Sequence, residues 1–267
     1  MTFPRLSVGS DVVFSGLGLH SGEPVDVTIR PSSHGIIFRN PKGAWSAIPE
    51  NVTDTSRCTR LGEISTIEHL MSAFCGLEIT DADVELSAGE LPALDGCSLA
   101  YVKGLQQAGL VTVGESTLRD PFTRIYLHDG DVKIAVASGD GHWRFEYITG
   151  ARWPGAQIYE ATGLPNGYEE QIAPCRTFGL EEEIPHLHAL GLAKGLDLST
   201  ALVLGREGYV NEAKFPDEPA RHKLLDCMGD LYLSGVPARF LSVVAERSGH
   251  RTNVAMAAKL RATTELV

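Results

Sequence analysis

Patterns typical of β-strands precede patterns typical of α-helices twice along the chain, and this order is the strongest constraint on its fold. In the first half, residues 24–30 alternate apolar and polar side chains, as a half-buried strand does, and apolar residues recur at helical spacing over 99–110. In the second half, the strand-like residues 132–136 precede a helical pattern at 217–234. Strands followed by helices in each half indicate an α+β fold, although no clean sequence repeat relates the halves.

Local signals place several element boundaries. Residues 65–68 (Ser-Thr-Ile-Glu) have the spacing of a capping box and predict a helix that begins near Ser65 and ends near Gly76. Residues 112–121 show no periodicity and are the predicted linker between the halves. Residues 150–174 are rich in glycine and proline and predict an irregular insertion.

The chain length fits a division at this linker. A chain of 267 residues is long enough for two small domains with a sizeable core. We therefore expect an N-terminal α+β domain at 1–115 and a C-terminal α+β domain at 119–267, the second of which contains the insertion.

Charge and cysteine content argue against several classes of protein. The net charge of −11 disfavours nucleic acid or an anionic membrane as the main partner. No apolar run approaches the ~18 residues of a membrane span, and the N-terminus lacks the apolar region of a secretory signal. The five cysteines form no C-x-x-C pair, which disfavours a disulfide framework or a cysteine-based zinc site and fits a reducing cytoplasm.

Three polar residues stand at intervals of four in the predicted helix 217–234. His222, Asp226 and Asp230 would share one face of that helix, because positions i, i+4 and i+8 lie one above another. Two potential ligands at i and i+4 can hold one metal ion. Without further evidence, a solvated polar face is the more common explanation of such a pattern.

Two further histidines can complete a catalytic set. His69 follows Glu68, and with His222 and Asp226 it would supply the three nitrogen and oxygen ligands of a catalytic zinc site. Glu68 also has a purely structural explanation as the acid of the capping box. His250 follows a glycine after a predicted strand, where side chains often reach a site. The histidines interpreted as solvated are His34, His128, His142, His186 and His188.

Eight segments in a fixed order identify a family. They are residues 16–22, 51–59, 65–70 (Ser-Thr-Ile-Glu-His-Leu), 91–96, 176–179 (Arg-Thr-Phe-Gly), 221–226 (Arg-His-Lys-Leu-Leu-Asp), 229–231 and 248–250 (Ser-Gly-His). In these segments the chain resembles the UDP-3-O-acyl-N-acetylglucosamine deacetylases of lipid A synthesis, over nearly its whole length.

The resemblance implies two similar domains, each a small β-sheet layered with two helices, with the helices packed between the two sheets. It implies a Zn²⁺-dependent deacetylase that acts on a UDP-linked acylated amino sugar. The implied zinc ligands are His69, His222 and Asp226. The implied catalytic residues are Glu68 as general base, His250 as general acid, Asp230 as its partner and Thr177 as a contact to the acetamide. The implied substrate-binding residues are Lys223, Glu183 and Phe178.

The departures from the family pattern, which also include the region near Trp153-Pro154 and residues Gly96-Cys97-Ser98, bear on substrate recognition. The loop between Thr59 and Ser65 is shorter than in many members, and Thr200 stands where an asparagine is usual. The insertion at 150–174 could provide an apolar passage through Ile158, Tyr159 and Leu164, or these residues could pack locally. A deacetylase for another acylated amino sugar and a non-catalytic binding protein remain as alternatives.

Overall fold

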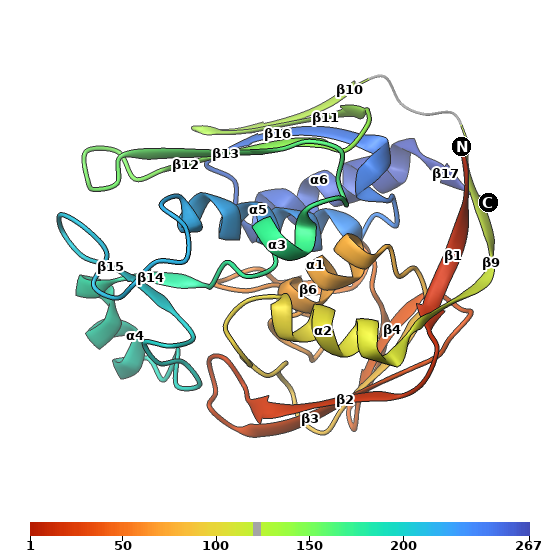
Figure 1. Ribbon diagram of the computed structural model, residues 1–267, viewed down its shortest axis with the longest axis horizontal. Coiled ribbons are helices and arrows are strands. Elements are labelled where there is room, and N and C mark those ends of the chain that lie inside the picture. The colour runs from red at the N-terminus through yellow and green to blue at the C-terminus, as the bar shows by residue number, and fades with distance from the viewer. Residues whose placement is uncertain (120–123) are drawn as a thin grey trace.

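Two five-stranded sheets form the outer layers of the molecule, and helices lie between them (Figure 1). The computed structural model describes residues 1–119 and 124–267. The first sheet has the order β2-β3-β8-β4-β5, with bounds Val12–Leu17, Pro24–Arg30, Ala82–Leu86, Ile36–Asn40 and Gly43–Ser46. The second has the order β10-β11-β16-β12-β13, with bounds Arg124–Asp129, Val132–Ser138, Leu241–Glu246, His142–Ile148 and Ala156–Ala161.

The two sheets share one topology. In each, the last strand in sequence lies between the second and the third, and it pairs parallel only with the third. All other neighbours in both sheets are antiparallel. The expected α+β fold of two similar halves is thereby confirmed, and the repeat lies in strand pairing rather than in the residues themselves.

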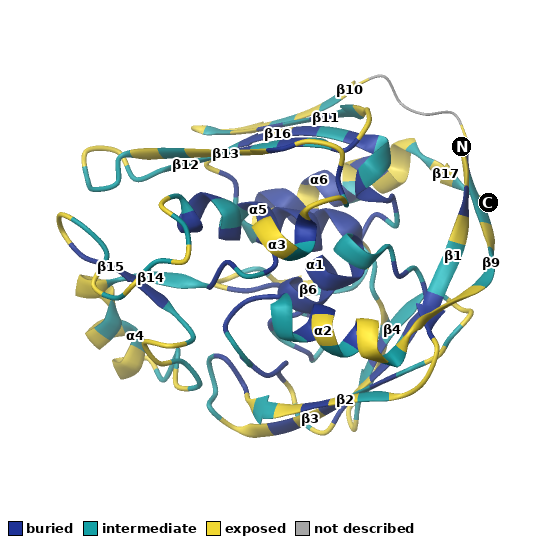
Figure 2. Ribbon diagram, in the orientation of Figure 1, coloured by how far each residue is buried: buried dark blue, intermediate teal, exposed yellow. Residues whose placement is uncertain are grey.

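The four longest helices among the described residues lie between the sheets. They are α1 (Glu68–Leu77), α2 (Leu99–Ala108), α5 (Glu218–Tyr232) and α6 (His250–Thr263). Figure 2 shows α1 and α5 largely buried at the centre of the molecule, where the cores of the two halves merge. A Cβ atom at Gly229 of α5 would lie 2.1 Å from the carbonyl oxygen of Glu68. The missing side chain therefore allows α5 to approach the first turn of α1 closely.

The helix over residues 65–76 begins and ends later than the sequence pattern predicts. Ile67 is the N-terminal flanking residue of α1, and no side chain caps this end, so the capping-box prediction is wrong. The Ser65 N–H donates to the carbonyl of Gly89, and Thr66 has a left-handed φ of 64°. Both features hold this segment outside the helix. The helix continues past Gly76 to Leu77, and Gly76 instead leaves room for the ring of Tyr168.

The predicted linker is also wrong over most of its length. Residues 112–119 belong to β9 (Leu110–Arg119), which pairs with β1 (Thr2–Val8) and β17 (Glu265–Leu266). Its pairing partners come from the two ends of the chain, so local periodicity could not reveal it. Residues 120–121 lie outside the described part of the chain, and the division at 1–115 and 119–267 stays a prediction.

The remaining elements are short. Residues 150–174 are less irregular than expected, because they contain β13 and the helix α3 (Tyr168–Gln171). The two-stranded sheets are β6-β7 (Val52–Asp54, Arg60–Leu61) and β14-β15 (Phe178–Leu180, Leu202–Leu204), and α4 spans Ile184–Ala189. The 3₁₀ helices are Pro49–Asn51, Glu181–Glu183 and Ala238–Phe240. No helix among the described residues is long and apolar enough to cross a membrane.

Candidate metal and catalytic site

Three potential metal ligands meet where α1 and α5 cross. His69 lies in the first turn of α1, and His222 and Asp226 lie one turn apart on α5. The Nε2 atoms of His69 and His222 lie 3.7 and 3.4 Å from Oδ1 of Asp226. One potential metal-ligand atom from each of the three residues lies within 4.8 Å of the other two. This buried cluster could hold a metal ion.

The protonation states of the cluster fit a cation. Burial and the neighbouring His222 lower the pKa of His69 to about 3, and burial lowers the pKa of His222. Both imidazoles therefore keep a free lone pair at neutral pH. Burial alone would raise the pKa of Asp226, but His222 and Lys223 outweigh it and hold that pKa far below its usual range.

One oxygen of Asp226 has no hydrogen-bond donor. Its Oδ2 accepts a hydrogen bond of 2.7 Å from Nζ of Lys223, whereas its buried Oδ1 accepts none from the described residues. A buried carboxylate oxygen without a partner is costly, by about 1–3 kcal/mol or more for a charged group. A metal ion between Oδ1 and the two imidazoles would remove that cost, so the donor set fits the metal that the sequence predicts.

The segment 175–177 is tied to α5 beside the cluster. Nδ1 of His222 donates to the carbonyl of Cys175 at 3.0 Å, which leaves Nε2 free as a ligand atom. The buried guanidinium of Arg176 pairs with Glu218, one turn before His222 on α5, at 3.0 Å. Since Arg176 directly precedes Thr177, these contacts fix the position of Thr177 at the pocket wall.

Glu68 and His250 form a second pair next to the metal cluster. Oε1 of Glu68 lies 3.9 Å from Nε2 of His250. The Nδ1 atom of His250 donates to Oδ2 of Asp230 at 3.0 Å, and Asn253 donates to the same oxygen at 3.0 Å. The other oxygen of Asp230 accepts the hydroxyl of Thr59 at 2.5 Å. Asp230 is therefore held firmly behind His250 and does not itself line the pocket.

This pair has pKa values suited to proton transfer. Burial raises the pKa of Glu68 to about 7, although His250 opposes the rise. Burial alone would lower the pKa of His250, but Asp230 and Glu68 outweigh it and raise this pKa to about 9. Between these values Glu68 is ionised and His250 is protonated. The site thus holds a proton acceptor and a proton donor side by side.

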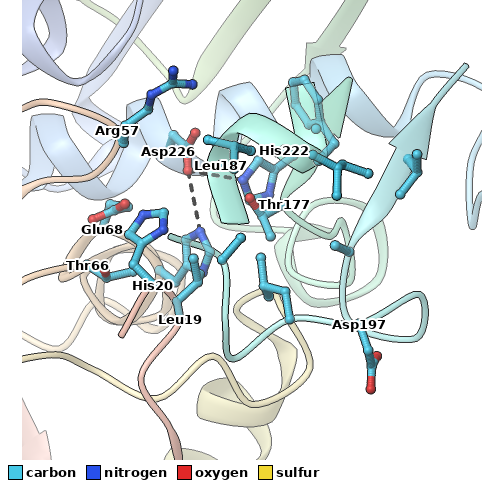
Figure 3. A pocket seen from close by; sticks show the side chains of 18 of the residues that line it. Leu19, His20, Arg57, Thr66, Glu68, Thr177, Leu187, Asp197, His222 and Asp226 are labelled. Carbon is cyan, nitrogen blue, oxygen red and sulfur yellow. Dashed lines mark ion pairs between the residues drawn. The ribbon is translucent and has the colours of Figure 1, made fainter. Parts of the chain in front are cut away.

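A cavity of about 450 Å³ contains the cluster and the pair (Figure 3). In the figure, Arg57, Glu68 and His20 lie along one side, and Thr177 and Leu187 lie along the other. The apolar residues of its lining are Leu19, Phe178, Ile184, Leu187, Ala193, Leu196, Leu198, Ala201 and Val203. Most of them belong to the segment between β14 and β15, so this segment forms an apolar wall.

The predicted substrate-binding residues are only partly brought together. Lys223 and Phe178 line the cavity, with Nζ of Lys223 5.6 Å from the centre of the Phe178 ring. Glu183 is exposed and is not in the lining, although the next residue, Ile184, is. Lys223 also contacts the candidate ligand Asp226.

The predicted apolar passage at 150–174 is not part of the cavity. Ile158 is 48% exposed on β13, Leu164 is buried, and Tyr159 packs under the guanidinium of Arg221. The alternative of local packing holds for Leu164 and Tyr159. Thr200 forms hydrogen bonds with the backbone N–H and carbonyl of Asp197 in the segment between β14 and β15.

Most of the other lining residues, including several polar ones, are not predicted from the sequence. His20 lies in the glycine-rich segment 16–22, and Arg57 and Thr66 lie in two other family segments, so the motifs marked their neighbourhood without a role. His188 is exposed, as predicted, and it also lines the cavity. It comes from α4, whose position depends on tertiary packing that no local pattern shows.

Known proteins match this chain along almost its whole length. The sequence model of the family described as UDP-3-O-acyl N-acetylglycosamine deacetylase (LpxC) matches residues 5–262. A UDP-3-O-acyl-N-acetylglucosamine deacetylase from Leptospira biflexa is 33% identical over 95% of this chain and 88% of its own length. Proteins of the same name from Cellvibrio japonicus and Trichormus variabilis are each 34% identical, over 90% and 94% of this chain and 84% and 96% of their own lengths. The chain belongs to the UDP-3-O-acyl N-acetylglycosamine deacetylase family.

Proposed function

We propose that this protein hydrolyses the N-acetyl group of UDP-3-O-acyl-N-acetylglucosamine and releases acetate, with one zinc ion held by His69, His222 and Asp226. The observation that supports this most is the unpartnered Oδ1 of Asp226, which faces two neutral imidazoles next to the Glu68–His250 pair. The names of the relatives support the substrate. We place the reaction in lipid A synthesis and in the cytoplasm, where the five buried free cysteines would stay reduced.

Each side chain has a separate task in the proposed hydrolysis. Bound zinc would polarise the amide carbonyl and make a water molecule more acidic. Glu68 accepts the proton of the attacking water, and the hydroxyl of Thr177 donates a hydrogen bond to the oxygen that gains negative charge. The C–N bond then breaks, and His250 passes the proton on Nε2 to the departing amine, which is otherwise a poor leaving group.

The cavity also fits the two ends of the substrate. The apolar wall between β14 and β15 would hold the 3-O-acyl chain, because it offers buried aliphatic surface beside the reaction centre. Lys223 and Phe178 line the same cavity beside His222 and are the proposed contacts to the nucleotide sugar. Glu183 could contribute only from outside the cavity.

Comparing two substrates tests the proposed function. Acetate release from UDP-3-O-acyl-N-acetylglucosamine should exceed release from UDP-N-acetylglucosamine by at least ~100-fold in kcat/KM, because the acyl chain buries several methylene groups at ~0.8 kcal/mol each. Equal rates would favour a deacetylase for another amino sugar. If the zinc-loaded protein releases acetate from neither substrate, the result would favour a non-catalytic binding protein.

Lys223→Ala is expected to raise KM about tenfold, with a smaller effect on kcat, because a charge-assisted contact to the substrate is lost. Lys223→Arg, which keeps the charge, is the control. Steady-state kinetics and zinc content should be measured together, since Lys223 also bonds Asp226. Loss of zinc with an unchanged KM would mean that Lys223 acts only through Asp226.

Asp230→Asn is expected to shift the alkaline limb of the pH–rate profile to lower pH. His250 must be protonated to act as an acid, so activity falls as pH rises through its pKa, and the Asp230 carboxylate raises that pKa. Asparagine can still accept the Nδ1–H bond but carries no charge. A profile of kcat/KM from pH 5 to 10 checks this, and an unmoved alkaline limb would show that Asp230 does not set the pKa of His250.

A further inference from the structure

A second cavity, of about 420 Å³, adjoins the catalytic one. His20 and Arg57 line both cavities, and they are the residues of the lining that the two share. The second cavity extends from them toward Arg60, Glu63, Ser65 and Gly89. The proposed reaction leaves its function unexplained.

The short connection between Thr59 and Ser65 forms one side of this second cavity. The connection contains β7 and a tight turn in which Ile64 N–H donates to the carbonyl of Leu61 at 2.9 Å. Arg60, Glu63 and Ser65 from this connection lie in the lining. Because only residues 60–64 separate Thr59 from Ser65, little chain is available to fill the space.

Arg57 carries the charge at the junction of the two cavities. Within residues 1–119 and 124–267, its guanidinium takes part in no hydrogen bond or ion pair. The other cations of the second cavity differ, since Arg60 and Lys42 lie 2.8 and 3.6 Å from the carboxylate of Glu63.

The backbone holds Arg57 in place at some cost. Its φ of 74° is left-handed, a conformation that costs a non-glycine residue about 1–2 kcal/mol. The preceding turn is fixed by Asp54, whose Oδ1 accepts the N–H groups of Thr55 and Ser56 at 2.8 and 3.0 Å. Arg57 is exposed at the junction of the two cavities, so its guanidinium is hydrated and accessible to an anion that passes between them.

The nearby carboxylate of Glu90 already accepts three hydrogen bonds. Its Oε1 accepts from the N–H of His20 and the hydroxyl of Thr66, at 2.8 and 3.0 Å, and its Oε2 accepts from the N–H of Ser21 at 2.9 Å. Nδ1 of His20 is buried and has no hydrogen-bond partner among the described residues. The junction thus offers one cation, Arg57, that is free to contact a small anion.

We propose that the second cavity is the exit for the acetate product, and that Arg57 binds the acetate carboxylate as it leaves the catalytic cavity. This inference rests on the proposed function, which makes acetate beside Glu68 and His250. The acyl chain and the nucleotide sugar occupy the other ends of the catalytic cavity at that moment. Acetate is small and anionic, so it can pass His20 toward the one unpaired cation of the described lining.

Inhibition by added acetate tests the role of Arg57 in the zinc-loaded enzyme. Arg57→Leu should raise the inhibition constant of acetate about tenfold, the value of one charge-assisted hydrogen bond, while Arg57→Lys should raise it less. The inhibition constant of UDP should stay within about twofold of the wild type. If the inhibition constant of UDP rises while that of acetate is unchanged, Arg57 binds the diphosphate and the proposal is overturned. If neither inhibition constant changes, the proposal is also overturned.

Filling the second cavity tests the exit itself. Gly89 lines it, and a Cβ atom there would contact only the carbonyl of Glu63, at 3.5 Å, so Gly89→Phe can be accommodated. Steady-state kcat should fall at least about fivefold while the single-turnover rate stays within about twofold, because product release becomes limiting. Gly208→Phe, with open space around its Cβ position, is the control. An unchanged kcat in a Gly89→Phe enzyme that melts like the wild type would overturn the exit.

The failure of this inference can be separated from the failure of the proposed function. Titration of ¹³C-acetate into zinc-loaded wild type and Arg57→Leu, followed by NMR, measures binding without turnover. Weaker binding in Arg57→Leu supports the site whether or not the wild type deacetylates the substrate. Equal binding in both proteins, with a wild type that does release acetate, overturns the site and leaves the proposed function intact.

Discussion

Glu68→Gln is expected to lower kcat/KM for acetate release by at least ~100-fold, the usual contribution of one general base. Glutamine cannot take a proton from water, but its carbonyl oxygen can still accept the Thr59 N–H, which now donates to Oε2 of Glu68 at 3.0 Å. Zinc content should stay at the wild-type level, since Glu68 is not one of the proposed ligands. Turnover, zinc content and melting temperature should be measured on the same preparation.

A structural role for Glu68 leads to a different result. If its carboxylate only anchors Thr59, the variant should lose about 1 kcal/mol of stability and turn over normally once folded. Asp81→Asn is a matched control, because Asp81 is a buried carboxylate that pairs with Arg5 and does not line the catalytic cavity. That variant should be less stable with unchanged kcat/KM. Normal turnover in Glu68→Gln would rule out the proposed mechanism.

His222→Ala is expected to remove the metal and to reduce acetate release by at least ~1,000-fold. The metal supplies several kcal/mol of transition-state stabilisation, and each 1.36 kcal/mol corresponds to a factor of ten. In this variant only Nε2 of His69 and Oδ1 of Asp226 remain of the three proposed metal ligands. Zinc content should fall from about one ion per chain to nearly none, as measured by elemental analysis.

His188→Ala provides the comparison for this variant. His188 lines the same cavity but lies outside the cluster of possible metal ligands, so its loss should leave zinc content unchanged. Equal zinc content in His222→Ala and His188→Ala would show that the metal is bound elsewhere or not at all.

The helical part of the site could be predicted because its geometry is local. The spacing of His222 and Asp226 is sufficient to place both side chains on one face of α5. His69 was different, because nothing in its local pattern shows that α1 crosses α5 at this point. Its residue type shows only that it could complete a zinc site, and the family resemblance implies that it does; the close approach at Gly229 shows what brings the three residues together.

Other features depended on contacts between distant segments and could not be read from periodicity. The start of α1 is set by Gly89, which bonds Ser65, and so a sequence that fits a capping box does not form one. The apolar wall comes from the segment between β14 and β15, which has little regular structure of its own, while the glycine- and proline-rich stretch chosen for an apolar passage forms part of a sheet. In both cases tertiary packing overrode the local signal.

The most direct test of the central claim is acetate release by the purified wild-type protein before and after metal removal. The protein is treated with a chelator, dialysed, and assayed on UDP-3-O-acyl-N-acetylglucosamine with and without one equivalent of Zn²⁺. We expect the untreated protein to contain about one zinc ion per chain, the treated protein to lose at least ~99% of its activity, and added Zn²⁺ to restore it. Full activity in protein shown to be free of metal would contradict the account.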